Sequence, residues 1–290
     1  MRRLPAAVAA IAAVLCMAAL VPIASAKPLP PGKVVAVEYA PPTAEEAAAH
    51  DLLTRTRVLK RAGRTVGREL ALGRPLKVRV VGANAPADDD PAPGPYYDPA
   101  NRTIHLSYGF VDDVQAALTR LVRRERIRIR PAVLTTAATE FILYHEIGHA
   151  LVHRLDVPVT GREEDAVDQL AALLSVSRGT GGDFVPLAAA MLFDAWDDGK
   201  APGAAEYADE HSLKQQRVYS FVCLVYGSNP RRFADLVGED GLPVQRAERC
   251  PAEWYQSYRS WTRLLRPYAR VKAPIPPPID RLGQGALPRR

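Results

Sequence analysis

The segment His145-Glu146-Ile147-Gly148-His149 constrains the fold of this chain more than any other, because it sets two imidazoles four residues apart around a carboxylate. In a helix, residues four apart lie on the same side, about 6 Å apart along the axis, so both imidazoles can hold one metal ion. Glu146 then lies beside the ion, where its carboxylate can accept a proton from a metal-bound water. Apolar residues at helical spacing across 136–155 support a helix, and two surface histidines without a metal are the alternative.

A catalytic zinc site needs three protein ligands and one open position. His153 is the next histidine along the chain, but its rise of about 12 Å from His145 is too large for one straight helix to supply all three ligands. The third ligand must therefore come from another element.

The residues after Thr160 predict that element, a second helix with an acidic cluster at its start. Thr160 and Glu163 have the pattern of a capping box, which gives Glu163 a structural role at the helix N-terminus. Glu164 is left free, and Asp168 follows it by one turn, so one carboxylate can bind the metal while the other orients a ligand histidine. Either acidic neighbour of Glu164 is the alternative ligand. We therefore expect three metal ligands: His145, His149 and Glu164.

The segment Glu164-Asp-Ala-Val-Asp168 resembles the Glu-x-x-(Ala/Ser)-Asp helix of the gluzincins, the zincin metallopeptidases in which a glutamate completes an HExxH site. Val167 stands where that family has a small residue, a departure that could loosen helix packing but keeps both carboxylates. The resemblance implies a zincin fold of the α+β class, with a small mixed α/β N-terminal lobe that holds the active-site helix and a mainly helical C-terminal lobe. It also implies one Zn²⁺ per chain and hydrolysis of peptide bonds by metal-activated water, with Glu146 as general base.

From Tyr96 to Tyr258 the chain resembles, more closely, a family of exported bacterial proteins regarded as metallopeptidases from their motifs. The order and spacing of the shared segments are not expected by chance, but the resemblance does not identify a substrate. Four segments carry it: Tyr96–Pro99 with Ile104–Tyr108, the block His145–Leu151, Gly161–Gln169, and Asp209–Arg217 with Cys223 and Cys250–Glu253.

The same resemblance implies roles for His211 and Arg217. Gluzincins commonly supply a histidine or tyrosine, from a segment after the glutamate helix, that donates a hydrogen bond to the oxyanion. In some membrane-bound gluzincins an arginine follows that histidine by six residues, and Arg217 stands at that distance from His211. The resemblance thus implies a catalytic His211 supported by Arg217. The alternative is that Asp209 caps a polar helix start that contains His211.

Residues 1–26 have the pattern of a secretory signal, with Arg2 and Arg3, an alanine-rich apolar run and a cleavage site expected after Ala26. We therefore expect an exported bacterial protein, periplasmic or secreted, with an uncleaved anchor as the alternative. No later apolar run approaches the roughly 18 residues of a membrane span. Loss of the signal leaves Cys223 and Cys250, and an even count in an oxidising compartment predicts one disulfide.

The formal charge of +6 is modest for 290 residues and falls further without the signal arginines, so nucleic acid is not indicated as a partner. Residues 123–130 are the densest basic run. We interpret them as the solvated end of an amphipathic helix, with contact to anionic lipid or envelope polymer as the alternative.

Periodicity also predicts the order of elements around the motifs. Residues 96–97 and 103–108 should pair as strands, and the family resemblance implies that an edge strand here lines the substrate cleft. We expect one domain of two lobes over 27–270, between the signal at 1–26 and a proline-rich tail at 271–290. The other expected elements are a helix over 45–72, a strand over 76–81 and helices over 184–196, 215–226 and 252–265.

Two functions of different classes fit these observations. The first is a zinc metallopeptidase that acts on a peptide or protein substrate. Its rival is a non-catalytic zincin-fold protein of the cell envelope that binds peptides or regulates a partner. Intact Glu146 favours the enzyme, because binding alone does not need a carboxylate there. Hydrolysis of a non-peptide amide in cell wall material is a third possibility, and the sequence does not fix the oligomeric state.

Overall fold

The structure is a computed structural model that describes residues 35–72, 74–83, 94–178, 181–238, 241–270 and 275. The expected signal at 1–26 lies outside the described residues, as does the tail at 271–290 apart from Ile275. The side chain of Ile275 is fully buried against the main hydrophobic core.

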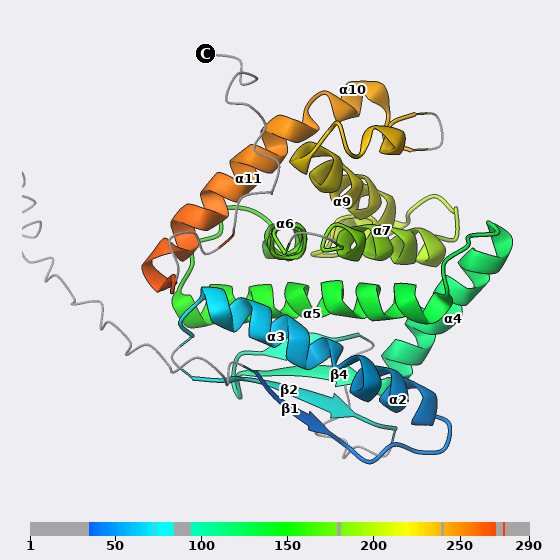
Figure 1. The fold of residues 1–290 in the computed structure, drawn as a ribbon, viewed down its shortest axis with the longest axis vertical. Helices are drawn as coiled ribbons and strands as arrows, with labels where there is room; N and C mark the ends of the chain where they lie inside the picture. The colour runs from blue at the N-terminus through cyan, green and yellow to red at the C-terminus, as the bar shows by residue number, and fades with distance from the viewer. Residues whose placement is uncertain are drawn as a thin grey trace, which may run out of the picture.

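A four-stranded mixed sheet forms one side of the molecule (Figure 1). Its strand order is β1-β2-β4-β3, where β1 spans Val35–Tyr39, β2 Leu76–Val81, β4 Thr103–Ser107 and β3 Tyr96–Asp98. The pairs β1–β2 and β2–β4 are parallel, with Val37 opposite Val78 and Val78 opposite Ile104. The short β3 runs antiparallel to β4, and it forms an edge of the sheet because it is the last strand in this order.

One long helix, α5 (Pro131–Leu155), runs through the middle of the molecule (Figure 1). Most of its residues are buried, because neighbours cover it on every side. The helices α2 (Ala47–Thr56), α3 (Val58–Glu69) and α4 (Tyr108–Arg124) contact it, as does β3. On the side away from the sheet it packs on α6 (Glu163–Val176) and α7 (Phe184–Trp196). This central position holds the His145–His149 segment between the two halves of the fold.

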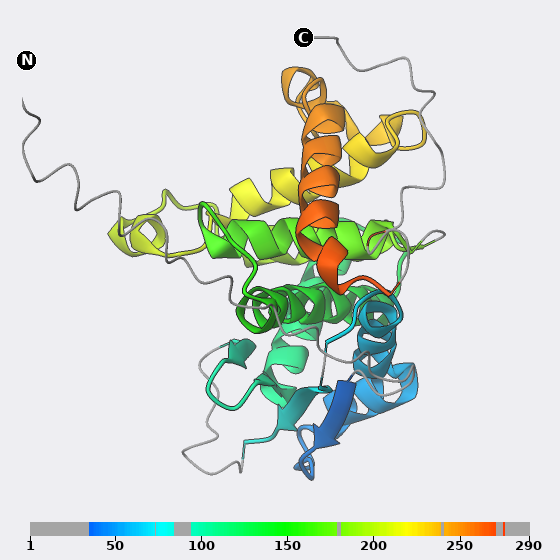
Figure 2. The same cartoon turned by 90° about the vertical axis from the view of Figure 1, so that its left-hand side faces the viewer.

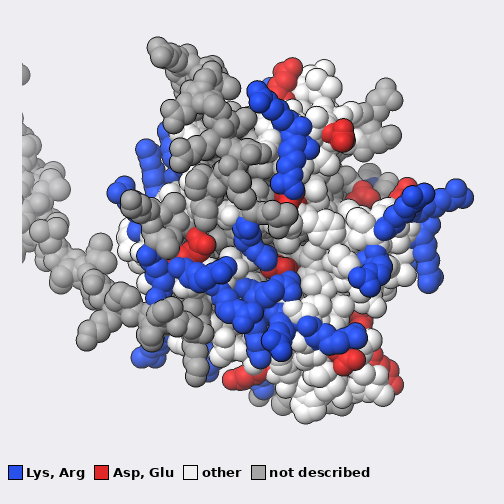
Figure 3. Space-filling view, viewed as in Figure 1, with Lys and Arg blue, Asp and Glu red and all other residues white. Residues whose placement is uncertain are grey.

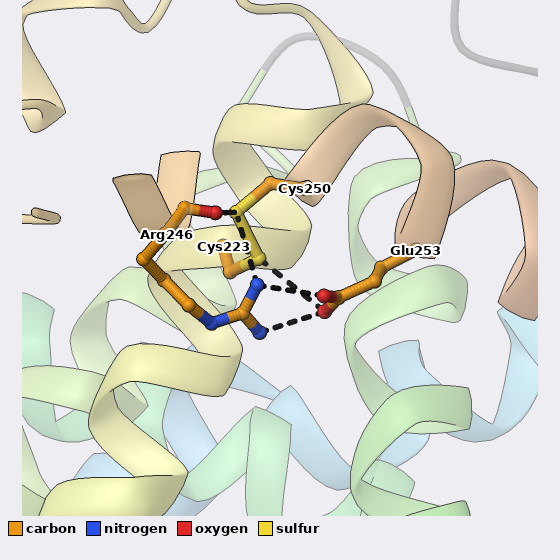
Figure 4. The surroundings of a disulfide bond; sticks show 4 residues. All are labelled: Cys223, Arg246, Cys250 and Glu253. Carbon is orange, nitrogen blue, oxygen red and sulfur yellow. Dashed lines mark hydrogen bonds and ion pairs between the residues drawn. A yellow bond between two sulfur atoms is a disulfide. The ribbon is translucent and has the colours of Figure 1, made fainter. Parts of the chain in front are cut away.

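The remaining elements form the helical C-terminal part: α8 (Ala204–Ala208), α9 (Lys214–Ser228), the 3-10 turns η2 (Ala234–Leu236) and η3 (Arg266–Tyr268), α10 (Val244–Ala247) and α11 (Cys250–Leu265). The disulfide Cys223–Cys250 joins α9 to the first residue of α11. Beside it, the Arg246 guanidinium donates two hydrogen bonds, of 2.7 and 2.6 Å, to the Glu253 carboxylate (Figure 4). The predicted disulfide is therefore present, at the far end of α9 from His211.

The mixed α+β class is confirmed, as are the strand over 76–81, the β3–β4 pair and the helix over 184–196. Two expectations are wrong. Residues 45–72 form two helices, because Arg57 adopts a left-handed conformation (φ 52°) between α2 and α3. The capping box at Thr160 is also absent, since α6 begins at Glu163 after Arg162 in extended conformation.

None of the helices in the described ranges is both long and apolar enough to cross a membrane.

Candidate metal centre

The helix α5 turns the imidazoles of His145 and His149 toward each other. Their Nε2 atoms lie 3.2 Å apart, and their rings meet edge to face. The side chain of His145 is almost fully buried, whereas that of His149 is half-buried toward solvent. The predicted spacing of four residues thus brings the same ring atom of both histidines to one point.

Glu164 reaches the same point from the first turn of α6. Its Oε2 atom lies 3.0 Å from His145 Nε2 and 3.3 Å from His149 Nε2. An ion with tetrahedral bonds of about 2.0 Å sets its ligand atoms about 3.3 Å apart, so these three atoms match one face of such a site. Glu164 Oε2 is also buried without a contact of hydrogen-bond geometry. A buried carboxylate oxygen left in that state fits a metal ligand.

Two carboxylates orient the histidines through their Nδ1 atoms, on the side of each ring away from the shared point. Asp168 Oδ1 lies 2.8 Å from His145 Nδ1, and Glu163 Oε1 lies 2.8 Å from His149 Nδ1. Each contact favours the proton on Nδ1 and leaves the Nε2 lone pair for the shared point. Asp168 has the predicted orienting position. Glu163 has a different role from the predicted helix cap, because its side chain contacts His149 instead.

Arg217 on α9 fixes the Asp168 carboxylate. The guanidinium donates two hydrogen bonds of 2.8 Å, from Nε and from one terminal nitrogen, and both groups are buried. The central carbon of the guanidinium, Cζ, lies over the Phe193 ring of α7, 4.0 Å from its centroid. Arg217 therefore links three helices to the orientation of His145.

His211 lies in the turn before α9 and enters the site from the open side. Its Nε2 atom is 3.0 Å from Glu164 Oε2, and its ring stacks on that of His145 at a centroid distance of 6.1 Å. Asp209 holds its Nδ1 atom at 2.9 Å, while Arg162 donates to its backbone carbonyl. Asp209 does not cap α9, which begins at Lys214. The group His145, Glu164 and His211 could itself hold a metal ion, since one atom of each lies within 4.8 Å of the others.

Electrostatics at the cluster follow from these contacts. Burial opposes charge on His145, but the Asp168 and Glu164 carboxylates outweigh it and raise the pKa of His145 to about 10. Burial also opposes charge on Glu164, and its contacts with three imidazoles hold its pKa far below the usual range. Without a metal, the protonated His145 imidazole offsets part of the carboxylate charge. A bound cation would take over that role and displace protons.

Glu146 is buried beside the two histidines of α5. Burial raises the pKa of its carboxyl, which the backbone N–H of Tyr97 on β3 and the neighbouring imidazoles partly oppose. The general-base candidate thus lies between the metal ligands and the edge strand of the sheet.

Gly148 lets α5 and α6 approach closely enough to form the site. A Cβ atom at Gly148 would lie 2.7 Å from Cβ of Val167, nearer than two carbon atoms can pack. Val167 is fully buried, so its bulk does not loosen the packing as the sequence suggested. The glycine compensates for the larger side chain on the facing helix.

The structure brings together all of the expected site residues on α5, α6 and the start of α9. Sequence reasoning missed Glu163 as the partner of His149 and Tyr97 as the backbone donor to Glu146. The signal for Glu163 was its place directly before Glu164 at the first position of the helix.

A family model described as "Putative metallopeptidase" matches residues 39–265. No curated protein matches the chain, and neither does a solved structure.

Proposed function

Because the chain belongs to the metallopeptidase family whose model spans residues 39–265, we propose that it is a zinc-dependent hydrolase of peptide bonds. In this proposal His145, His149 and Glu164 bind one Zn²⁺, and the zincin fold is of the gluzincin type. Nitrogen and carboxylate ligands in a tetrahedral arrangement favour zinc over other divalent ions.

One observation carries the proposal: His145 Nε2, His149 Nε2 and Glu164 Oε2 form a triangle with sides of 3.0 to 3.3 Å. Helices α5 and α6 supply these atoms, and Asp168 and Glu163 orient the imidazoles from behind. Three converging ligands with oriented imidazoles are typical of a catalytic zinc site, which keeps its fourth position open.

The roles of the other residues follow from their positions. A bound metal ion would acidify water and polarise a substrate carbonyl. Glu146 would take the proton from the attacking water and pass it to the leaving amine, and its burial suits a base that must hold a proton in between. His211 would donate to the oxyanion from the open side of the site. The outer edge of β3 would bind an extended peptide through backbone hydrogen bonds.

The Cys223–Cys250 disulfide supports export to an oxidising compartment, together with the signal pattern at residues 1–26.

Metal content tests the proposal first. Elemental mass spectrometry on protein purified without chelator should find about one zinc per chain in wild type and clear losses in His149→Ala and Glu164→Gln. Lack of zinc in the wild-type protein, even after zinc is added back, would overturn the proposed site.

Activity separates the enzyme from its rival, the non-catalytic peptide-binding protein. Glu146→Gln should keep the zinc but lose hydrolysis of a mixed peptide library by at least about 100-fold. If wild type and Glu146→Gln are equally inactive and both bind peptides, the binding function replaces the enzyme.

A further inference from the structure

The outer face of α3 carries cations only. We use the term basic face for Arg57, Lys60, Arg64 and Arg68 of this helix region together with Arg55 at the end of α2, all five of which are exposed. At 100° per residue, the four residues from 57 to 68 fall within an arc of about 80°. The opposite side of α3 is buried, and its only acidic residue, Glu69, stands at its last position.

These cations form no close ion pairs, and the nearest acidic influence is Glu69, whose pKa the Arg68 charge lowers against the effect of burial. Across the described residues, none of the five lies within ion-pair distance of a carboxylate. Figure 3 shows the result, a cluster of Lys and Arg over the centre of the face where α3 lies in Figure 1. A solvated helix face normally mixes both signs of charge, so a face of one sign that spans about 16 Å indicates an anionic partner.

A groove adjoins the basic face, and its lining is also positively charged. It has a volume of about 640 Å³ between α2, the start of α5 and the turn after α6. Four guanidinium groups line it, against one carboxylate, Glu140. Glu140 is buried and pairs with both Arg61 and Arg178, so a single negative charge is shared between two cations. The four arginines are Arg55, Arg61, Arg130 and Arg178.

The groove opens on a different side of α5 from the candidate metal centre. Glu140 in the groove precedes His145 by five residues, which places the two side chains about 140° apart around the helix axis. Arg178 follows the C-terminal end of α6, whereas Glu164 stands at its start. In Figure 2 the blue helices α2 and α3 lie on the right, and the yellow-green α8, which ends three residues before His211 in the sequence, lies on the left. A ligand on the basic face would therefore leave the metal centre open.

We propose that the basic face and its groove bind a linear polyanion that carries phosphate or carboxylate groups. Successive anionic groups lie along the row on α3, and one group enters the groove between Arg61, Arg130 and Arg178. The groove is concave, which fits a polymer chain better than a flat bilayer. Among the described residues, the exposed tyrosines Tyr207, Tyr219 and Tyr255 lie outside the basic face, and Phe184 is the one aromatic residue that lines the groove, so a row of stacking platforms for nucleic acid is not present there.

Binding of two defined polymers to the full chain tests this proposal. Long-chain inorganic polyphosphate and poly-L-glutamate distinguish phosphate from carboxylate recognition, and fluorescence anisotropy at several salt concentrations gives Kd and its salt dependence. Lys60→Glu with Arg64→Glu should raise Kd for the preferred polymer by at least about tenfold and flatten its salt dependence. Arg130→Glu should also raise this Kd, because it removes a cation that lines the groove while the basic face is unchanged.

A matched control variant makes the same two reversals of charge on another part of the surface. Arg231 and Arg249 are exposed and lie in the C-terminal helical part, so Arg231→Glu with Arg249→Glu should alter Kd by less than about twofold. Thermal unfolding and zinc content should be equal in all variants, which separates this surface from the metal centre. If the reversal pair unfolds, Lys60→Gln with Arg64→Gln replaces it.

Three results would overturn the proposal. They are no binding of either polymer by wild type, an equal loss in the control pair, and binding only to vesicles that contain anionic phospholipid.

Discussion

At the scale of single residues, the structure gives Glu163 a contact with a ligand histidine that the neighbouring Asp165 is not recorded to make. Because Glu163 holds His149 Nδ1, we expect Glu163→Ala to weaken zinc binding by about tenfold or more. The side chain of Glu163 is half-exposed, so the fold should be unaffected. Competition with a chromophoric chelator measures the affinity. Asp165→Ala is the matched control, since it removes the same charge from the same helix turn, and a loss as large as that of Glu163→Ala would assign the effect to charge alone.

His211 offers a second residue-scale prediction, because its two possible roles give opposite metal contents. As an oxyanion donor, His211→Ala should retain about one zinc and lower kcat by about 100-fold, with a smaller effect on KM. Elemental analysis and steady-state kinetics on the same preparation decide the matter. Loss of zinc together with activity would instead make His211 a ligand, as its 3.0 Å contact with Glu164 allows.

The sequence could predict that His145 and His149 converge, because one helix fixes their mutual positions. The positions of Glu164 and Asp168 beside them followed from the same rule applied to a second helix. Glu163 could not be assigned in this way, because its role depends on where α6 begins. A start two residues earlier would have made it a cap, whereas the observed start at Glu163 directs its side chain to the other helix.

At the scale of elements, the contact between α5 and α6 controls the geometry of the site. Gly148→Ala would place a Cβ atom 2.7 Å from Val167 Cβ and push the helices apart. We expect a loss of about 1–3 kcal/mol in stability and weaker zinc binding. Val167→Ala in the same chain should restore part of both, because it removes the clashing side chain. Thermal unfolding and zinc titration of the two single variants and the double variant measure this coupling.

If the two substitutions were additive, the clash between α5 and α6 would not be the cause.

The break between α2 and α3 shows what periodicity cannot predict about elements. Apolar residues keep helical spacing on both sides of Arg57, so the sequence predicts one continuous helix. The break lies at Arg57, whose left-handed backbone ends α2, and beyond it α3 packs on β1 so closely that a Cβ at Gly63 would clash with the Val35 side chain. The order of strands in the sheet likewise depends on packing that no local pattern records.

At the scale of the whole molecule, the disulfide joins two helices that are distant in sequence. It closes a loop of 27 residues between α9 and α11, so Cys223→Ser with Cys250→Ser should cost roughly 3–4 kcal/mol of stability. Chemical denaturation with and without reductant measures this loss. The double variant should be insensitive to reductant, and zinc content should be kept, because His211 and Arg217 lie at the other end of α9.

Metal binding should stabilise the whole chain in a manner that depends on pH. In the metal-free site the pKa of His145 is raised to about 10, so this imidazole is protonated at neutral pH and must lose its proton to bind zinc. Zinc affinity should therefore rise with pH. The stability of the metal-free protein should change with pH in the opposite direction. The contribution of protonated His145 to that stability is complete below about pH 6.5, the pKa of histidine in the unfolded chain, and is lost as pH rises toward 10.

The difference in Tm between the zinc-loaded and chelator-treated proteins should consequently be larger at about pH 8 than at about pH 6. Differential scanning calorimetry at both values measures it, with Glu164→Gln as a control that should show little difference at either pH. A difference that does not grow between these two pH values would contradict this view, because it would mean that zinc displaces no proton from His145.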